Sequence, residues 1–452
     1  MQVLTIGLIF ALLVGCLLTH EEIGNGKISP DKLKEDVEFL FENIEQIHPN
    51  PYGFTDKRNV YEMKKQLIQD LDEPMDSIEF YKKLAPIIVE LNDGHTFIVP
   101  PVSKHLEKIK LFPLDIVIIE DKVLVKNDYS STIQRGSELL SLNNIPIRTI
   151  LNQLLRYISS ETRGHAIAQL QRFFPLYLSI EFGLPDKFST KVKNSEIKIV
   201  EIPSVCPESM EGSWLTLPPY SYRYLEGYKV GILTMRSMEN PKEFEEWLKD
   251  IFPQLREKDA DLIIDLRDCQ GGNSVLGDMV ISYISEKDLH VSGGESYSKV
   301  SEQLKKQRDY EWLQNAKIGD VIEEMLEEFV INTRGFGFNG NVSVLTSPFT
   351  YSSADGFVKN IKEFDLGRIV GEETGSVSPR YGDNVIIVLP NSKISVGIAT
   401  RYMPSDEKTG GVIPDYEVKP KPDDLITGED RVLNFVLEEL IGDNYQNNTS
   451  SS

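Results

Sequence analysis

Three short segments of the chain carry the residue types that nucleophilic catalysis requires. The first is Thr-Tyr-Ser-Ser-Ala-Asp at residues 350–355, in which Ser352 lies between an apolar run and an expected helix. Backbone N–H groups converge at a helix N-terminus and the dipole favours negative charge there, which suits a nucleophile whose attack creates an oxyanion. Serine is equally a common helix cap, so this segment alone leaves both interpretations open.

The second segment is Asp-Leu-Arg-Asp-Cys-Gln-Gly-Gly-Asn at residues 265–273. Its Gly271 and Gly272 permit backbone geometry that other residues avoid, and they let an N–H group approach a substrate carbonyl closely. The third segment is Asp-Gly-His-Thr at residues 93–96, and His95 is of the type that most often acts as a general base. Singly, the glycine pair also fits a tight turn, and His95 also fits a surface or capping histidine.

Together and in order, these segments resemble the tail-specific (C-terminal processing) family of serine peptidases. The chain contains the family's patterns L-x-D-x-H-T at 91–96, I-D-L-R-x-x-x-G-G at 264–272, T-x-S-x-x-D at 350–355, G-E-x-T at 371–374 and G-V-x-P-D at 411–415. The resemblance covers residues 30–420 or so, which is nearly the whole of the expected mature chain.

The resemblance implies that the nucleophile is Ser352, three residues before Asp355, which replaces the commoner glutamate. Ser353 is the fallback nucleophile. The backbone N–H of Ser353, with that of Gly271 or Gly272, would form the oxyanion hole. The resemblance implies no metal ion and no organic cofactor.

The choice of base follows from a departure from the family pattern. Many members use a lysine just beyond G-E-x-T, but this chain has Gly-Ser-Val-Ser-Pro-Arg at residues 375–380. Arg380 cannot take the place of that lysine, because a guanidinium does not give up its proton. The chain therefore resembles the Ser-His-Glu branch, which implies His95 as base and Glu407, with Asp406 beside it, as the acid that orients the imidazole. A solvated turn is the alternative interpretation of these two acids.

The elements that must position these residues fall into three regions. Residues 29–100 indicate a helical domain, because Ser29 and Pro30 are typical of a helix start and apolar residues then recur at spacings of three and four. Residues 220–440 alternate apolar runs with helical patterns, which predicts an α/β core with a mainly parallel sheet covered by helices. We expect a disordered tail at residues 441–452.

Between these regions, residues 111–200 favour a small β domain. Residues 114–119 and 123–125 predict a hairpin, and the stretch 136–147 resembles the PDZ pattern G-x-x-L-L-x-I-N-G-x-P-V, with Asn144 where glycine is usual. A PDZ domain takes an extended peptide as an added strand, so the resemblance implies a role in substrate docking. The alternative is an ordinary hairpin with an Asn-Asn turn, and the helical pattern over residues 149–174 departs from a standard PDZ domain.

Residues 1–20 predict a secretory signal. Their apolar run at residues 6–18 is too short to span a bilayer as a mature helix, and it fits the core of such a signal. Leu-Val-Gly-Cys at residues 13–16 resembles a bacterial lipobox, which would leave Cys16 as a lipid-carrying N-terminus. No Lys or Arg precedes the run, and a cleaved signal with a chance cysteine is the alternative. We expect a lipoprotein anchored to a membrane of the bacterial cell envelope, outside the cytoplasm.

Composition narrows the function further. The chain of 452 residues has a formal charge of −22, which argues against nucleic-acid binding. Cys206 and Cys269 lie in no His/Cys cluster, so no metal site is expected. The resemblance implies a serine endopeptidase that acts on extended or C-terminal polypeptide segments. The alternative is a non-catalytic member of the same fold that binds peptides or lipids.

Overall fold

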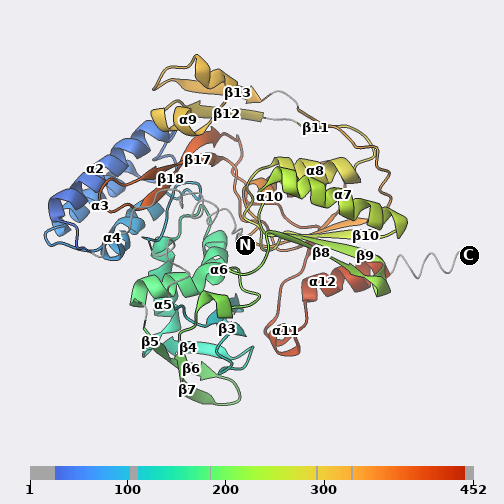
Figure 1. Ribbon diagram of the computed structural model, residues 1–452, viewed down its shortest axis with the longest axis horizontal. Helices are drawn as coiled ribbons and strands as arrows, with labels where there is room; N and C mark the ends of the chain where they lie inside the picture. The colour runs from blue at the N-terminus through green and yellow to red at the C-terminus, as the bar shows by residue number, and fades with distance from the viewer. Residues whose placement is uncertain (1–25, 102–109, 184, 292–293, 327–328, 443–452) are drawn as a thin grey trace, which may run out of the picture.

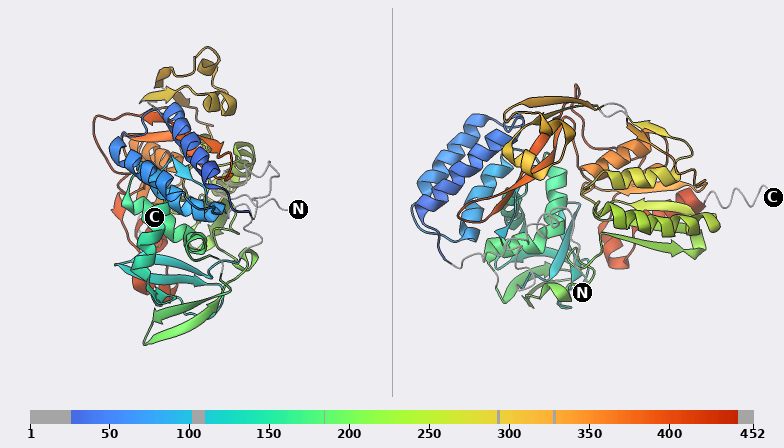
Figure 2. Two further views of the ribbon diagram at one scale, coloured as in Figure 1. Left: turned by 90° about the vertical axis from the view of Figure 1, so that its left-hand side faces the viewer. Right: turned by 45° about the horizontal axis from the view of Figure 1, so that its top comes forward.

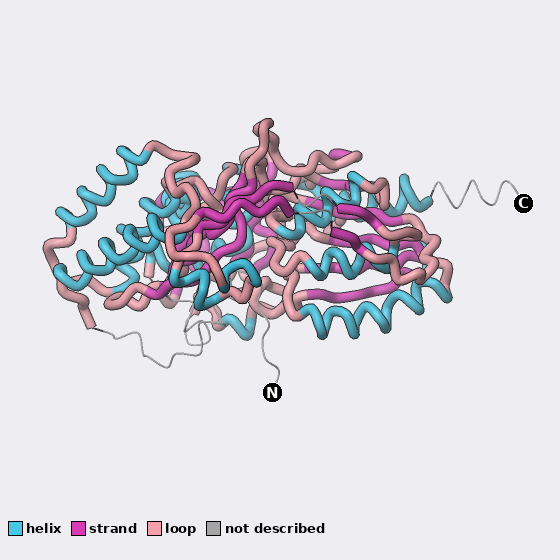
Figure 3. Tube along the Cα trace, turned by 90° about the horizontal axis from the view of Figure 1, so that it is seen from above, coloured by secondary structure: helices cyan, strands magenta, loops and turns pink. Residues whose placement is uncertain are grey.

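The computed structural model describes residues 26–101, 110–183, 185–291, 294–326 and 329–442. Over these residues the protein is a mixed α/β structure with several sheets, which confirms the predicted class at that level. Figure 3 shows strands running through the middle of the molecule with many of the helices towards the outside. Two of the sheets carry residues of the site, and the sheet of strands β2–β7 (residues 114–203) lies beside them.

The N-terminal region forms the predicted helices α2 (Pro30–Ile47), α3 (Lys57–Asp70) and α4 (Ser77–Val89). Proline occupies the first turn of α2, and Asp76 caps α4 in a capping box with Glu79. After α4, the segment of His95 leads directly into strand β1 (Phe97–Ile98). The helices bury apolar residues in a common core, and α2 and α4 contact the sheet to which β1 belongs. Figure 1 shows these blue helices beside β17 and β18.

That sheet joins strands from distant parts of the sequence. Its members are β1, β12 (Gly294–Lys299), β13 (Val321–Leu326), β17 (Arg380–Val388) and β18 (Ser395–Met403). All its pairings are antiparallel, and β1 pairs with β18 so that Phe97 lies opposite Gly397. After residue 371 the chain returns to the N-terminal helices through β17 and β18. The pairing of β18 with β1 therefore places the segment of His95 next to the C-terminal half of the chain.

The second sheet lies away from the β12–β13 hairpin, at the other end of the molecule in both views of Figure 2 and in Figure 1. It contains β2 (Leu114–Ile119), β3 (Lys122–Asp128), β4 (Glu138–Leu142), β5 (Ile145–Pro146), β6 (Lys187–Lys193) and β7 (Ile197–Pro203). The predicted β2–β3 hairpin is confirmed, and Asn143 and Asn144 turn the chain between β4 and β5 with φ of 47° and 64°. Helices α5 (Ile147–Leu154) and α6 (Arg163–Phe182) follow, and α6 packs along β2.

The third sheet has the order β19-β16-β15-β10-β9-β8. Its members are β8 (Tyr220–Leu225), β9 (Val230–Met235), β10 (Asp261–Asp265), β15 (Val342–Thr346), β16 (Arg368–Gly371) and β19 (Tyr416–Glu417). Every pairing except β8–β9 is parallel. The chain runs out of β10 and β15 at their carboxyl ends, where sites are built in open sheets.

Helices cover both faces of this third sheet. Leu262 and Ile264 pack on one face with α7 (Pro241–Glu257), α8 (Val275–Ile284) and α10 (Ser353–Glu363). Ile263 faces the other side, against α12 (Arg431–Phe435) and the π-helix Val436–Ile441. This alternation follows from the two-residue period of a strand, and Figure 1 shows α7 and α12 on opposite sides of the sheet.

The remaining elements are β11 (Leu289–Val291), β14 (Phe329–Ile331), α9 (Glu302–Gln307), α11 (Pro422–Thr427) and short 3-10 turns at Leu155–Tyr157, Pro207–Ser209, Glu226–Tyr228 and Glu311–Gln314. In the described part of the chain no helix is long and apolar enough to cross a membrane. The expected signal at residues 1–20 and its Cys16 lie outside the described residues. Of the expected tail, Ile441 is buried in the core and residues 443–452 lie outside the description.

Candidate active site

Ser352 lies in the turn between β15 and α10, immediately before the helix. Its φ of 55° and ψ of −121° are unusual for a residue other than glycine. Hydrogen bonds from the preceding residues fix this turn, because Thr350 Oγ1 donates to Leu266 O at 2.8 Å and Tyr351 N donates to Cys269 O at 3.2 Å. The serine is therefore held in a strained turn by the segment that follows β10.

Gly271 and Gly272 lie against this turn. Their φ values are +92° and +138°, which glycine adopts readily. A Cβ at Gly271 would lie 2.7 Å from both Ser353 N and Tyr351 O, so no larger residue fits there without movement. Ser353 Oγ donates to Gly272 O at 2.6 Å, and Ser353 N lies in the first helical turn, where no carbonyl precedes it to accept a helical bond.

His95 meets Ser352 from the opposite side. The imidazole Nε2 lies 3.0 Å from Ser352 Oγ, although 257 residues separate the two in the sequence. Asp93 accepts the backbone N–H of His95 at 2.9 Å and so fixes the loop. Burial lowers the pKa of His95 below its ordinary value, against the opposing charge of Asp93. A neutral imidazole in contact with a serine hydroxyl is the arrangement that a general base needs.

The loop before His95 is anchored by a buried pair. His48 Nε2 lies 3.1 Å from Asp93 Oδ2, and His48 Nδ1 accepts from Asn50 N at 3.1 Å. Burial alone raises the pKa of Asp93, but the hydrogen bond and charge of His48 outweigh it and hold the pKa below its ordinary value. Asp93 therefore stays ionised, with one oxygen on His48 and the other on the backbone of His95.

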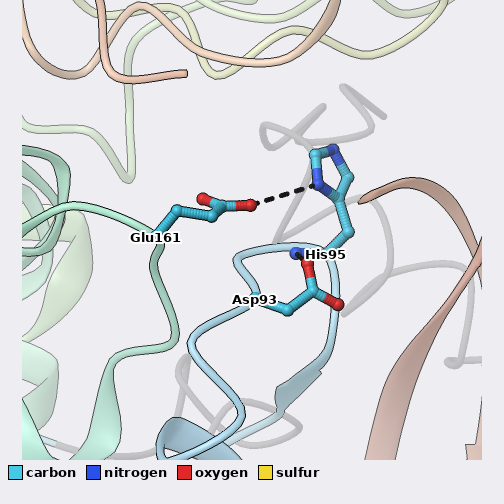
Figure 4. A group of neighbouring side chains, drawn as sticks. All are labelled: Asp93, His95 and Glu161. Carbon is cyan, nitrogen blue, oxygen red and sulfur yellow. Dashed lines mark hydrogen bonds and ion pairs between the residues drawn. The ribbon is translucent and has the colours of Figure 1, made fainter. Parts of the chain in front are cut away.

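The sequence analysis missed Tyr351 and Glu161, which face the other nitrogen of His95. Tyr351 Oη lies 3.0 Å from His95 Nδ1 and donates to the two oxygens of Glu161 at 2.8 and 2.9 Å. Glu161 Oε1 lies 3.9 Å from His95 Nδ1 (Figure 4). Burial, together with the charge of Asp93, raises the pKa of Glu161 to about 7.

Residues 229–418 match the sequence model of peptidase family S41. Over these residues the chain is similar to peptidase family S41. The match contains Ser352, Gly271 and Gly272, whereas His95 and Glu161 lie outside it. A search of curated protein sequences found no match.

Two solved structures share the fold of this chain, and a third aligns with a lower score. A crystal structure of a CPAF mutant aligns with a TM-score of 0.65 and 15% identity, covering 91% of this chain and 96% of that chain. The structure of mature CPAF complexed with lactacystin gives a TM-score of 0.63 and 16% identity, covering 91% and 98%. The photosystem II D1 C-terminal processing protease aligns with a TM-score of 0.45 and 13% identity, covering 86% and 94%.

Glu407, expected as the orienting acid, lies elsewhere in this structure. It occupies an exposed turn, where its backbone N–H donates to Ser405 Oγ at 3.3 Å. Asp406 is exposed in the same turn. Glu161 is the carboxylate that the structure brings to His95. Its position in a loop just before α6 gave no sequence signal, because no motif or spacing links it to the other segments.

The structure also shows the contacts of Ser353 and Arg380, the other two residues considered for the catalytic machinery. Ser353, the fallback nucleophile, has its hydroxyl bound to Gly272 O, whereas the hydroxyl that faces His95 is that of Ser352. Arg380, the residue in place of the lysine, pairs with the buried Asp355 at 3.0 Å. Its guanidinium thus supports the start of α10.

One group of described side chains has ligand atoms close enough to hold a metal ion. In Asp93, His95 and Glu161 these atoms all lie within 4.8 Å of one another. The carboxylate oxygens already accept hydrogen bonds from His48, Tyr351 and the backbone of His95. The arrangement is therefore satisfied as a hydrogen-bond network, which favours proton chemistry at His95.

Proposed function

We propose that the protein is a serine endopeptidase in which Ser352 attacks the peptide carbonyl and His95 takes its proton. The observation that carries the proposal is the 3.0 Å contact between Ser352 Oγ and His95 Nε2. The N–H of Ser353, with that of Gly271 or Gly272, would stabilise the oxyanion, since Gly271 packs against the backbone of the serine turn and Gly272 O accepts a hydrogen bond from Ser353 Oγ. The match of residues 229–418 to the model of peptidase family S41 supports a polypeptide substrate.

The direct test is labelling of the purified protein with a fluorophosphonate, followed by peptide mass spectrometry. We expect the label on Ser352 and not on Ser353, and we expect it to disappear in Ser352→Ala, in His95→Ala and after denaturation. Hydrolysis of an unstructured protein should disappear with it. A folded protein that is never labelled and binds peptide equally well after Ser352→Ala would instead favour the non-catalytic alternative.

We propose that the sheet β2–β7 acts as a PDZ-like docking domain for an extended or C-terminal peptide. Strand β2 is at one edge of this sheet, and α6 lies along it. Gln171 of α6 accepts the backbone N–H of Ile118 at 2.5 Å, so an added strand has to displace this side chain. Binding of a peptide to the Ser352→Ala protein should therefore tighten in a Gln171→Ala background, and unchanged affinity would refute docking at this edge.

We further propose that Cys16 carries a lipid that anchors the mature protein outside the cytoplasm. The support is the Leu-Val-Gly-Cys sequence at residues 13–16. Metabolic labelling of bacteria with a fatty acid should mark the wild-type protein and not the Cys16→Ala variant. A cleaved but unlabelled wild-type protein would contradict the anchor.

A further inference from the structure

The pair Tyr351 and Glu161 occupies the place where a serine peptidase needs a group to orient its base. We infer that Tyr351 is a positioning residue that transmits the influence of Glu161 to His95, so that the base is oriented through a phenol. The inference rests on the proposed function, because it assigns a role towards the proposed base. It replaces the expected Glu407 with two residues from different parts of the chain.

The distances require an intermediary between the carboxylate and the imidazole. At 3.9 Å, Glu161 Oε1 is too far from His95 Nδ1 for a hydrogen bond. Tyr351 Oη spans this gap, since it lies 3.0 Å from the imidazole nitrogen and within 2.9 Å of both carboxylate oxygens. The phenol is thus hydrogen-bonded on both sides.

The single phenolic proton fixes the tautomer of His95. When Glu161 is ionised, it only accepts, so Tyr351 donates to it and must accept from His95 Nδ1–H. Nε2 is then unprotonated and can accept the proton of Ser352 Oγ. If Glu161 is protonated, it can donate to the phenol, which can turn its own proton towards Nδ1. Nε2 then carries the hydrogen and cannot act as the base.

Tyr351 and Glu161 keep the same protonation states while Ser352 attacks the peptide carbonyl. The Ser352 proton moves to Nε2, and the imidazolium formed keeps Nδ1–H on the phenolic oxygen. Tyr351 keeps its own proton on Glu161, because burial and the charge of Glu161 hold its pKa well above the ordinary value. The pair therefore orients and stabilises the imidazolium without accepting its proton, as expected of the third member of a triad.

The surroundings hold the phenol in place. The Tyr351 ring stacks on His165 with 4.1 Å between ring centroids and an interplanar angle of 15°. His165 is tied by its Nδ1 to Pro348 O at 2.9 Å, and burial lowers its pKa to about 4, so it stays neutral. Gly94 leaves the room that the pair needs, because a Cβ there would lie 2.5 Å from Tyr351 Oη and 2.9 Å from a Glu161 oxygen.

The charged groups around the pair come from every neighbouring segment. Asp93 and His95 face it from the loop before β1, Arg380 and Asp383 act from β17, and His165 lies on α6. With the pKa of Glu161 at about 7, its ionisation falls in the range in which the enzyme would work. Activity should therefore rise with pH through about 7, as Glu161 loses its proton and the productive tautomer becomes dominant.

The test compares purified Tyr351→Phe, Glu161→Gln and Ser352→Ala proteins. Tyr351→Phe should lower kcat on the order of 10²–10⁴-fold with KM nearly unchanged, as loss of an orienting group does. Glu161→Gln should lower kcat about 10-fold or more and remove the rise near pH 7. Tyr81→Phe is the matched control, because the Tyr81 hydroxyl is buried and has no hydrogen-bond partner among the described residues. It should retain the wild-type rate and pH profile.

A tautomer measurement keeps the inference testable if one variant folds poorly. Nitrogen-15 spectra of histidine in the Ser352→Ala protein should show His95 with hydrogen on Nδ1 above pH 7, and with a mixture below it. Wild-type kcat, pH profile and tautomer in the folded Tyr351→Phe protein would overturn the inference while leaving the peptidase intact. Full activity in Ser352→Ala would instead overturn the proposed function itself.

Discussion

The two sides of the candidate site are held in place by different kinds of contact. On the side of Ser352, main-chain groups that follow β10 and β15 bind one another, and all of them lie within the S41 match at residues 229–418. On the side of His95, buried polar side chains from separate elements make the contacts. The first side depends on backbone geometry and the second on the protonation and packing of side chains.

This difference predicts different responses to mutation and to pH. The serine turn packs against Gly271, where a side chain would collide with backbone atoms, so it should be sensitive to added atoms and insensitive to pH. The histidine side contains Asp93, Glu161, His48 and His165, all of them buried, so it should respond to pH and to the loss of a single hydrogen bond. The following predictions test this contrast.

Of the substitutions that follow, Gly271→Ala should have the largest effect. Its Cβ would lie 2.7 Å from two backbone atoms of the serine turn, and the φ of +92° disfavours alanine as well. We expect kcat/KM to fall about 10²–10³-fold, as when an oxyanion-hole donor is lost. The free energy of unfolding should fall by about 1–3 kcal/mol, as measured by urea denaturation.

Gly183→Ala is the matched control for that prediction. Gly183 has a comparable φ of +75°, and a Cβ there meets nothing within 4 Å. It should share the backbone strain and keep full activity. Equal activity losses in the two variants would mean that strain, and not collision with the serine turn, governs the effect.

Glu161→Gln should change how stability depends on pH. Burial raises the pKa of Glu161 from 4.5 to about 7, so its contribution to stability is fully present below pH 4.5 and is lost as pH rises through 7. Between these limits the wild type should lose about 3 kcal/mol relative to the glutamine variant, since each pKa unit corresponds to about 1.4 kcal/mol. Urea denaturation of both proteins at pH 5 and pH 8 measures the difference.

Asp278→Asn provides a comparison outside the site. Burial raises the pKa of Asp278 on α8 from 3.8 to about 6, so its stability difference should develop between those values, below the range for Glu161. Activity at neutral pH should not change in this variant. Identical pH ranges for the two variants would contradict the burial of Glu161 described here.

The same contrast explains what the sequence could and could not predict. Ser352, His95 and Gly271 each lie at the end of one element, in a short local pattern, so their neighbourhoods could be interpreted residue by residue. Glu161 meets Tyr351 across 190 residues, and neither local pattern contains information about the other. The resemblance to the Ser-His-Glu branch implies Glu407, but the exposed turn in which Glu407 lies takes its carboxylate away from His95.

At the level of the fold, elements that local sequence patterns specify were predicted, whereas the pairing of distant segments was not. The helix Pro30–Ile47, the hairpin Leu114–Ile119 with Lys122–Asp128, and the Asn-Asn turn all follow from spacing or turn chemistry. The pairing of β1 with β18 was not predicted, because nothing near Phe97 specifies a partner as distant as Gly397. That pairing brings the loop of His95 to the returning chain, so the histidine side of the site depends on the least local contacts of the fold.

Gly94→Ala should have the smallest effect of those tested, on activity alone. The new methyl group would collide with the ends of the Tyr351 and Glu161 side chains, and these can move where backbone cannot. We expect kcat to fall about 10-fold as the phenol loses alignment, with KM and stability little changed. Gly356→Ala on α10 is the control, because a Cβ there meets nothing within 4 Å. This substitution should raise helix stability by about 0.5–1 kcal/mol. If Gly94→Ala proved as damaging as Gly271→Ala, the histidine side would be as rigid as the serine turn, and the contrast between backbone and side-chain support would not hold.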